Sequence, residues 1–119
     1  MKSVFSALVC CFIATGVHAN LSPAPAMTAP LAEKSLLLDI ENVTQSYLIA
    51  VGERGHILKS TDGKVWHQMP VPVQSTLTAV NFIDPQHGWA VGHDATILAT
   101  TDGGNTWTIQ KYQPEPEKP

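Results

Sequence analysis

AVGERGHILKSTDG, residues 50–63, returns forty positions later as AVGHDATILATTDG, residues 90–103. Eight of the fourteen paired residues are identical without a gap, and Ser60 paired with Thr100 keeps a hydroxyl group. A repeat of this length is typical of proteins built from successive copies of one small folded unit. The chain therefore contains two such units in tandem.

Each unit divides into four short runs of strand-forming residues, bounded by Gly, Pro, Asn or Asp. The repeat continues outside its most similar part, because Leu37 pairs with Leu77 and Trp66 with Trp107, the latter at an offset of 41. No stretch carries a helical period long enough to compete with the strands. We expect strands at residues 36–41, 47–52, 56–61 and 65–69 in the first unit and at 77–83, 88–92, 96–101 and 106–112 in the second.

Four strands in about forty residues have the size of one β-propeller blade. The expected fold is all-β, with two four-stranded antiparallel blades at about residues 35–70 and 77–112. Propellers close through several blades, so we expect a partial propeller, the N-terminal piece of a longer one. Two blades share one interface, whereas repeat proteins generally need about three units for stability. We therefore expect self-association through the open blade faces rather than a stable closed monomer.

The second unit contains a complete Asp-box, in which a hydroxyl residue, an Asp, a Gly, a Thr and an aromatic residue recur at fixed spacing. Its members are Thr100, Asp102, Gly104, Thr106 and Trp107. The carboxylate is expected to accept backbone N–H groups of the turn, the Gly to adopt a positive φ, and the Trp to be buried against the sheet. The pattern predicts a structural turn.

The first unit carries a degraded Asp-box at Ser60, Asp62, Gly63 and Trp66. This copy is one residue shorter, and Val65 replaces the Thr of the box. We expect its turn to be tighter or differently bonded. Because an acidic residue recurs at equivalent turns in both units, we interpret both acids as structural residues rather than as a catalytic pair.

The first 19 residues have the features of a secretory signal peptide, with Lys2 before an apolar run and the cleavage site Val17-His18-Ala19. Cleavage before Asn20 would leave no transmembrane anchor, since the apolar run is shorter than the roughly twenty residues of a membrane-spanning helix. Both cysteines, Cys10 and Cys11, would be removed with it. We expect an exported, periplasmic protein, or a protein of the thylakoid lumen if the organism is photosynthetic.

The segments flanking the blades are rich in Pro. Residues 20–34 suit an extended leader, with folded structure beginning near Ser35, and residues 113–119 form a Pro-rich tail. The whole chain has 7 basic and 10 acidic residues and a net charge of -3. This balance argues against nucleic acid as a partner.

These motifs resemble the Asp-box propellers, also called bacterial neuraminidase repeats. The phrases LTAVNF at residues 77–82, HGWAVG at 87–92 and TDGGNTW at 101–107 are similar to the photosystem II assembly and stability factor family and its exported relatives in other bacteria. The resemblance covers about residues 35–112. It implies a non-catalytic propeller that assists or binds a membrane or periplasmic protein complex.

The alternative is a glycan-binding or sialidase-like propeller of which this chain is a catalytically incomplete piece. Sialidases clamp a carboxylate with three arginines, whereas Arg54 is the only arginine here. We therefore expect no enzyme activity, and we expect no cofactor. We also expect no metal site, because the histidines lack close ligand spacing and cysteine companions. Loops on a rigid scaffold concentrate recognition residues. The candidate partner-binding residues lie in two equivalent loops and are Glu53, Arg54, His56, His93 and Asp94.

Overall fold

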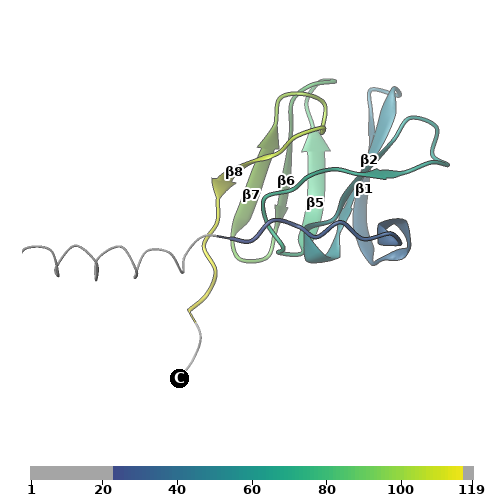
Figure 1. The fold of residues 1–119 in the computed structure, drawn as a ribbon. Coiled ribbons are helices and arrows are strands. Elements are labelled where there is room, and N and C mark those ends of the chain that lie inside the picture. Colours follow the sequence, from purple (N-terminus) through teal and green to yellow (C-terminus); the bar gives the residue numbers. More distant parts are fainter. Residues whose placement is uncertain (1–22, 117–119) are drawn as a thin grey trace, which may run out of the picture.

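Two four-stranded antiparallel sheets lie side by side in the computed structural model, which describes residues 23–116 (Figure 1). The expected signal peptide at residues 1–19 lies outside the described residues. Each sheet has its strands in chain order, so each is a simple up-and-down meander. The first blade contains β1 (Leu37–Val43), β2 (Tyr47–Gly52), β3 (Ile57–Ser60) and β4 (His67–Gln68), and the second contains β5 (Leu77–Phe82), β6 (Gly88–Gly92), β7 (Thr96–Thr100) and β8 (Thr108–Lys111).

The all-β fold class predicted from the repeat is confirmed. Strands β2 and β6 have the expected bounds, whereas β4 has only two residues and β8 begins later than expected. Both late starts follow the Asp-box turns, whose side-chain bonds hold the chain out of the sheet. The only helices within residues 23–116 are the short 3-10 turns η3 (Ala32–Lys34) and η4 (Glu53–Gly55). No helix in this described part is long and apolar enough to cross a membrane.

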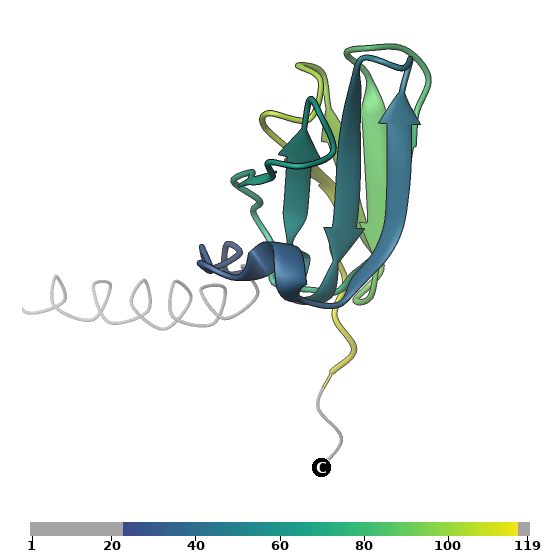
Figure 2. The same cartoon turned by 90° about the vertical axis from the view of Figure 1, so that its right-hand side faces the viewer.

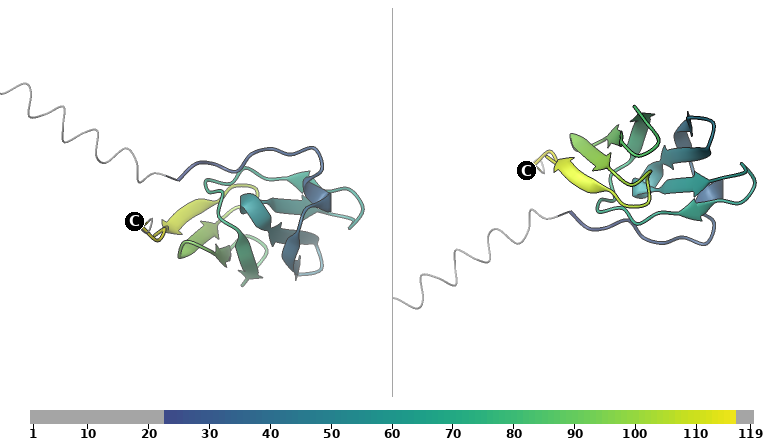
Figure 3. Two further views of the ribbon diagram at one scale, coloured as in Figure 1. Left: turned by 90° about the horizontal axis from the view of Figure 1, so that it is seen from below. Right: turned by 90° about the horizontal axis from the view of Figure 1, so that it is seen from above.

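The core lies between the two sheets. We call the side of a blade that points along the chain toward the next unit its forward face, and the opposite side its rear face. The forward face of the first blade meets the rear face of the second, and Figure 3 shows the two sheets from both ends of this contact. The buried apolar residues are Val43, Ile49, Val51 and Ile57 from the first blade, Leu77, Val80, Ala90, Leu98 and Trp107 from the second, and Val71 and Val73 from the linker.

Two carboxylates of β1 complete this contact. Strand β5 is an edge strand, so some of its backbone N–H groups have no partner in its own sheet. The Asp39 Oδ2 atom accepts the N–H of Val80 at 2.9 Å, and Glu41 Oε1 accepts that of Phe82 at 3.1 Å. The two blades are therefore joined by hydrogen bonds as well as by apolar packing.

The leader differs from the expectation that residues 20–34 stay unpacked and that folded structure begins near Ser35. The Ala26 N–H donates to the Val71 carbonyl at 2.8 Å, and Gln68 bonds both the Ala29 N–H and the Met27 carbonyl. Ala32 is buried on the first blade. An extended Pro-rich segment forms no hydrogen bonds within itself, so its backbone groups are available to other partners. The Gln68 side chain on β4 and the Val71 carbonyl after it provide those partners. Figure 2 shows the leader and η3 beside the first sheet.

Replacement of Asp39 tests the hydrogen bonds between the blades. The variant Asp39→Ala leaves the partly buried N–H of Val80 without an acceptor, which should lower the free energy of unfolding by about 1–2 kcal/mol. Chemical denaturation monitored by tryptophan fluorescence measures the change. The charge-matched variant Glu115→Ala, in the exposed tail, should leave the unfolding midpoint unchanged. Equal stability of the two variants would contradict the bridging role of Asp39.

Candidate partner-binding surface

The complete Asp-box turn uses its carboxylate entirely within the turn. Asp102 accepts the backbone N–H of Thr106 at 2.9 Å and its hydroxyl at 2.6 Å, and it also accepts the Thr100 hydroxyl at 2.8 Å. Burial raises the pKa of Asp102, but the hydrogen bonds from Thr106 and Thr100 outweigh it, so the pKa lies below its ordinary value. An acid held ionised and fully bonded is poorly suited to proton transfer.

Backbone geometry fixes the same turn against the first blade. Gly104 has a φ of +87°, and a Cβ there would lie 2.8 Å from Ile49 Cδ1. The Trp107 Nε1–H donates to the Gly104 carbonyl at 2.9 Å, and the indole is buried between the blades. The Gly therefore serves both the positive φ and the close approach of the two blades.

The first Asp-box has a different bonding pattern. Asp62 Oδ1 accepts the backbone N–H groups of Lys64 at 2.8 Å and Val65 at 2.9 Å, together with the Ser60 hydroxyl at 3.1 Å. The N–H groups of Val65 and Lys64 hold the pKa of Asp62 below its ordinary value. With Val65 in place of Thr, the turn has no side-chain hydroxyl on its far side. Trp66 lies on the rear face of the first blade.

A further cluster at the Asp-box end joins the blades, and the sequence analysis did not identify it. The Lys59 ammonium lies 4.2 Å from the centre of the Tyr47 ring and donates to the Gly103 carbonyl and to Asn105 Oδ1. The Tyr47 hydroxyl donates to the Pro85 carbonyl at 2.5 Å. The sequence feature that could have indicated this cluster is Lys59, a charged residue within an apolar strand at a position where the second unit has Ala99. This end of the molecule is closed by internal bonds.

The candidate recognition loops lie at the opposite end, where β2 turns into β3 and β6 into β7. Three of the five predicted residues have partners within the chain. Glu53 Oε1 accepts the Leu36 N–H at 3.1 Å, and Asp94 Oδ2 accepts the Ser75 hydroxyl at 2.5 Å. His56 is buried, with Nδ1 lying 3.0 Å from the Ser35 hydroxyl oxygen.

Arg54 and His93 are exposed, and neither side chain forms a hydrogen bond within residues 23–116. The five residues do not form one site. Arg54 and His56 line a groove of about 450 Å³ together with Gln74 and leader residues 27–30, whereas His93 and Asp94 line a separate hollow with residues 113–116. The leader wall of the groove was not foreseen, because the leader was expected to lie away from the blades.

No group of three His, Cys, Asp or Glu side chains within residues 23–116 is placed to hold a metal ion. One pair of such groups lies at an exposed turn, where His87 Nδ1 is 3.0 Å from the Asp84 carboxylate. The acidic residues of the two Asp-boxes belong to separate turns and bond their own backbone. Each of these acids is thus engaged within its own turn.

Comparison with known proteins places these features in context. The family model described as Photosynthesis system II assembly factor YCF48 matches residues 59–118. The photosystem II stability/assembly factor HCF136 of Cyanidioschyzon merolae is 37% identical over 59 residues, 48% of this chain and 14% of that protein. The photosystem II assembly protein Ycf48 of Thermosynechococcus vestitus is 40% identical over 50 residues, 42% of this chain and 14% of that protein. The matched part thus spans a small fraction of these relatives.

A solved structure, titled "YCF48 bound to D1 peptide", is similar in fold. It superimposes with a TM-score of 0.61 and 24% sequence identity, covering 79% of this chain and 33% of that one. At this level of identity the likeness shows the shared blade architecture. Both described blades therefore have the form of propeller blades.

The burial of His56 predicts a pH dependence of stability. Burial lowers the pKa of His56 below 6.5, with a further lowering from Arg54 against a raising effect of Glu53. The unfolded chain therefore takes up this proton first. The contribution of the neutral His56 side chain to the free energy of unfolding is fully present above about pH 6.5. It is lost as the pH falls from there through the lowered pKa of the folded state. The variant His56→Thr, which copies Thr96 of the second unit, should show a flatter fall in Tm between about pH 7.5 and about pH 5.5.

Thermal melts followed by circular dichroism at several pH values measure this slope. The exposed His93→Thr variant is the matched control and should keep the slope of the unaltered protein. An unchanged slope in the His56 variant would show that its burial does not govern this pH range.

Proposed function

The chain belongs to the Photosynthesis system II assembly factor YCF48 family, and on that basis we propose that it is a non-catalytic scaffold that binds a protein segment of a membrane complex during assembly. The observation that carries this proposal is the groove between the leader and the β2–β3 loop. The relatives are named for photosystem II assembly or stability, and the similar structure has a D1 peptide bound. Both support a protein ligand.

The groove suits an extended peptide. It is lined by Met27, the small side chains of leader residues 28–30, His56, Gln74 and the exposed Arg54. A guanidinium donates two parallel hydrogen bonds to a carboxylate, which lysine does not reproduce. We propose that a peptide with an acidic group binds here, with its carboxylate on Arg54 and its apolar part against the leader.

A non-enzymatic role is supported by the way the acidic groups are used. Both Asp-box carboxylates accept several hydrogen bonds inside their own turns. The three-arginine clamp of a sialidase is not available to a chain with a single arginine. Hydrogen-bonded turns and an exposed guanidinium in a recognition loop are features of a binding scaffold.

We propose an exported location, the periplasm or the thylakoid lumen. The relative from Synechocystis is named a photosystem II assembly lipoprotein, which supports exposure at a membrane surface. A partner there would present loops or termini of a membrane protein to the groove. The exposed loop end is suited to such a contact because the other end is closed by the Lys59 cluster.

Replacement of Arg54 tests the groove. The tagged chain is first isolated from solubilised membranes of the source organism. Mass spectrometry then identifies the protein that co-purifies with it. A fluorescent peptide from its exposed acidic segment should bind the unaltered chain, and Arg54→Ala should weaken binding by about tenfold or more. The control Lys64→Ala removes an exposed cation at the opposite end and should bind normally. Equal binding by both variants would remove the groove from the proposal.

A further inference from the structure

The two outer faces of the molecule repeat the two surfaces that meet inside it. The rear face of the second blade packs through Val80, Ala90 and Leu98, which are paired across β5, β6 and β7. Forty positions earlier, Ile40, Ala50 and Leu58 are paired in the same way on the rear face of the first blade. In this copy Ala50 and Leu58 are buried in a cluster with Ala32 of the leader, whereas Ile40 is exposed.

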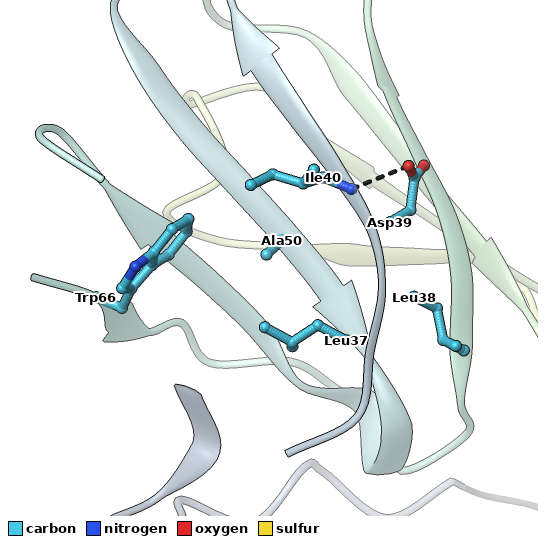
Figure 4. Close-up of a pocket in the computed structure, with 6 residues that line it drawn as sticks. All are labelled: Leu37, Leu38, Asp39, Ile40, Ala50 and Trp66. Carbon is cyan, nitrogen blue, oxygen red and sulfur yellow. Dashed lines mark hydrogen bonds between the residues drawn. The ribbon is translucent and has the colours of Figure 1, made fainter. Parts of the chain in front are cut away.

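The two copies of the rear face differ in how far their first-strand residue is exposed to solvent. Val80 is 6% exposed, whereas its counterpart Ile40 is 57% exposed. Figure 4 shows the open depression beside it, in which Leu37, Ala50 and Trp66 form an apolar floor. In the second blade the equivalent position is covered by the first blade. The depression is therefore open at the position that the first blade covers in the second.

The forward faces show the same relation. Ile49 and Val51 of the first blade are fully buried under the second blade. Their counterparts Trp89 and Val91 are each 39% exposed on the outer side of the second blade, on the same face as Ile97. The rear face of the first blade and the forward face of the second blade thus each expose a counterpart of one side of the central interface.

The leader covers part of the rear face of the first blade and leaves Ile40 exposed. The linker before β5 places Val71 and Val73 in the core with Ala90 and Leu98. The leader before β1 places Ala32 in a cluster with Ala50 and Leu58, the counterparts of those residues. The leader therefore occupies on the first blade the place that the linker occupies between the blades.

The polar groups are also compatible with a new neighbour. At the central contact Asp39 and Glu41 bind N–H groups of β5, and the counterparts of these acids are Ala79 and Asn81. The Ile40 N–H, which would face Ala79, already donates to Asp39 Oδ1 at 2.9 Å. The contact would therefore leave this donor satisfied and bury no additional carboxylate.

We propose that a second copy of this chain docks head to tail, with the rear face of its first blade on the forward face of the second blade. The contact repeats the central interface and is heterologous, so further copies add in the same sense to form a ring or an open chain. The occupant of both faces is thus the chain itself. The inference rests on the repeat and is independent of the peptide groove.

Two variants that each disable one face test the proposal. Ile40→Glu blocks the rear face and Val91→Glu blocks the forward face, because each would bury a charge against apolar side chains. In sedimentation velocity, the unaltered chain from Asn20 onward should associate as its concentration rises. Each variant alone should be monomeric, with association weakened by about tenfold or more. An equimolar mixture should give a one-to-one dimer and nothing larger.

The matched control is Val65→Glu, at an exposed turn outside both faces, which should associate like the unaltered chain. If either face variant fails to fold, the pair Ile40→Cys and Val91→Cys provides a second measurement, since only mixed samples should form the disulfide-linked dimer. A monomeric unaltered chain, a Val91→Glu variant that still pairs with itself, or a mixture that stays monomeric would each overturn the proposal.

Discussion

The contact between the forward face of the first blade and the rear face of the second is the interaction on which the rest of the structure depends. A small four-stranded sheet exposes apolar residues on both sides, and neither side is stable in water without a covering layer. Here one side of each sheet covers the other, and Trp107 lies between them. The carboxylates of Asp39 and Glu41 add direction, because they bond the exposed edge of β5 and so set how the two sheets align.

The same contact makes the two ends of the molecule different. At one end the Lys59 side chain on β3 bonds Gly103 and Asn105 in the Asp-box turn of the second blade and so ties the blades together. At the other end the turns join strands within each blade. Arg54 and Asp94 adopt positive φ values there, and Arg54 is exposed whereas Asp94 accepts the Ser75 hydroxyl. One end thus holds the geometry of the two blades, and the other leaves loop side chains such as Arg54 exposed.

The sequence predicted the blades well because the signal was doubled. A forty-residue period with two Asp-boxes defines four strands per unit, and strands β2 and β6 have the expected bounds. The start of β8 was missed because the Thr106 N–H bonds to Asp102 instead of the sheet, which depends on the side-chain geometry of the turn. The leader was missed because a Pro-rich segment carries no apolar period, although Ala32 buries well against a surface that only the folded blade creates.

Candidate residues were harder to predict, because a loop position does not reveal which groups have internal partners. Glu53, His56 and Asp94 were grouped with Arg54 by position alone, yet Leu36, Ser35 and Ser75 bond them from segments distant in the sequence. No pattern in one sequence marks such pairs before the fold brings them together.

The differences between the repeats follow from the neighbours that each blade has. The forward face of the first blade carries Asp39 and Lys59, and both contact the second blade. At the equivalent positions the second blade has Ala79 and Ala99, which offer apolar surface in place of charge. A charged group buried on a sheet face is costly unless it is hydrogen-bonded. Asp39 accepts the Val80 N–H and Lys59 donates to the Gly103 carbonyl, so both charges have a backbone partner in the second blade. The identical positions of the two units thus maintain the blade, and the variable positions determine what each blade face contacts.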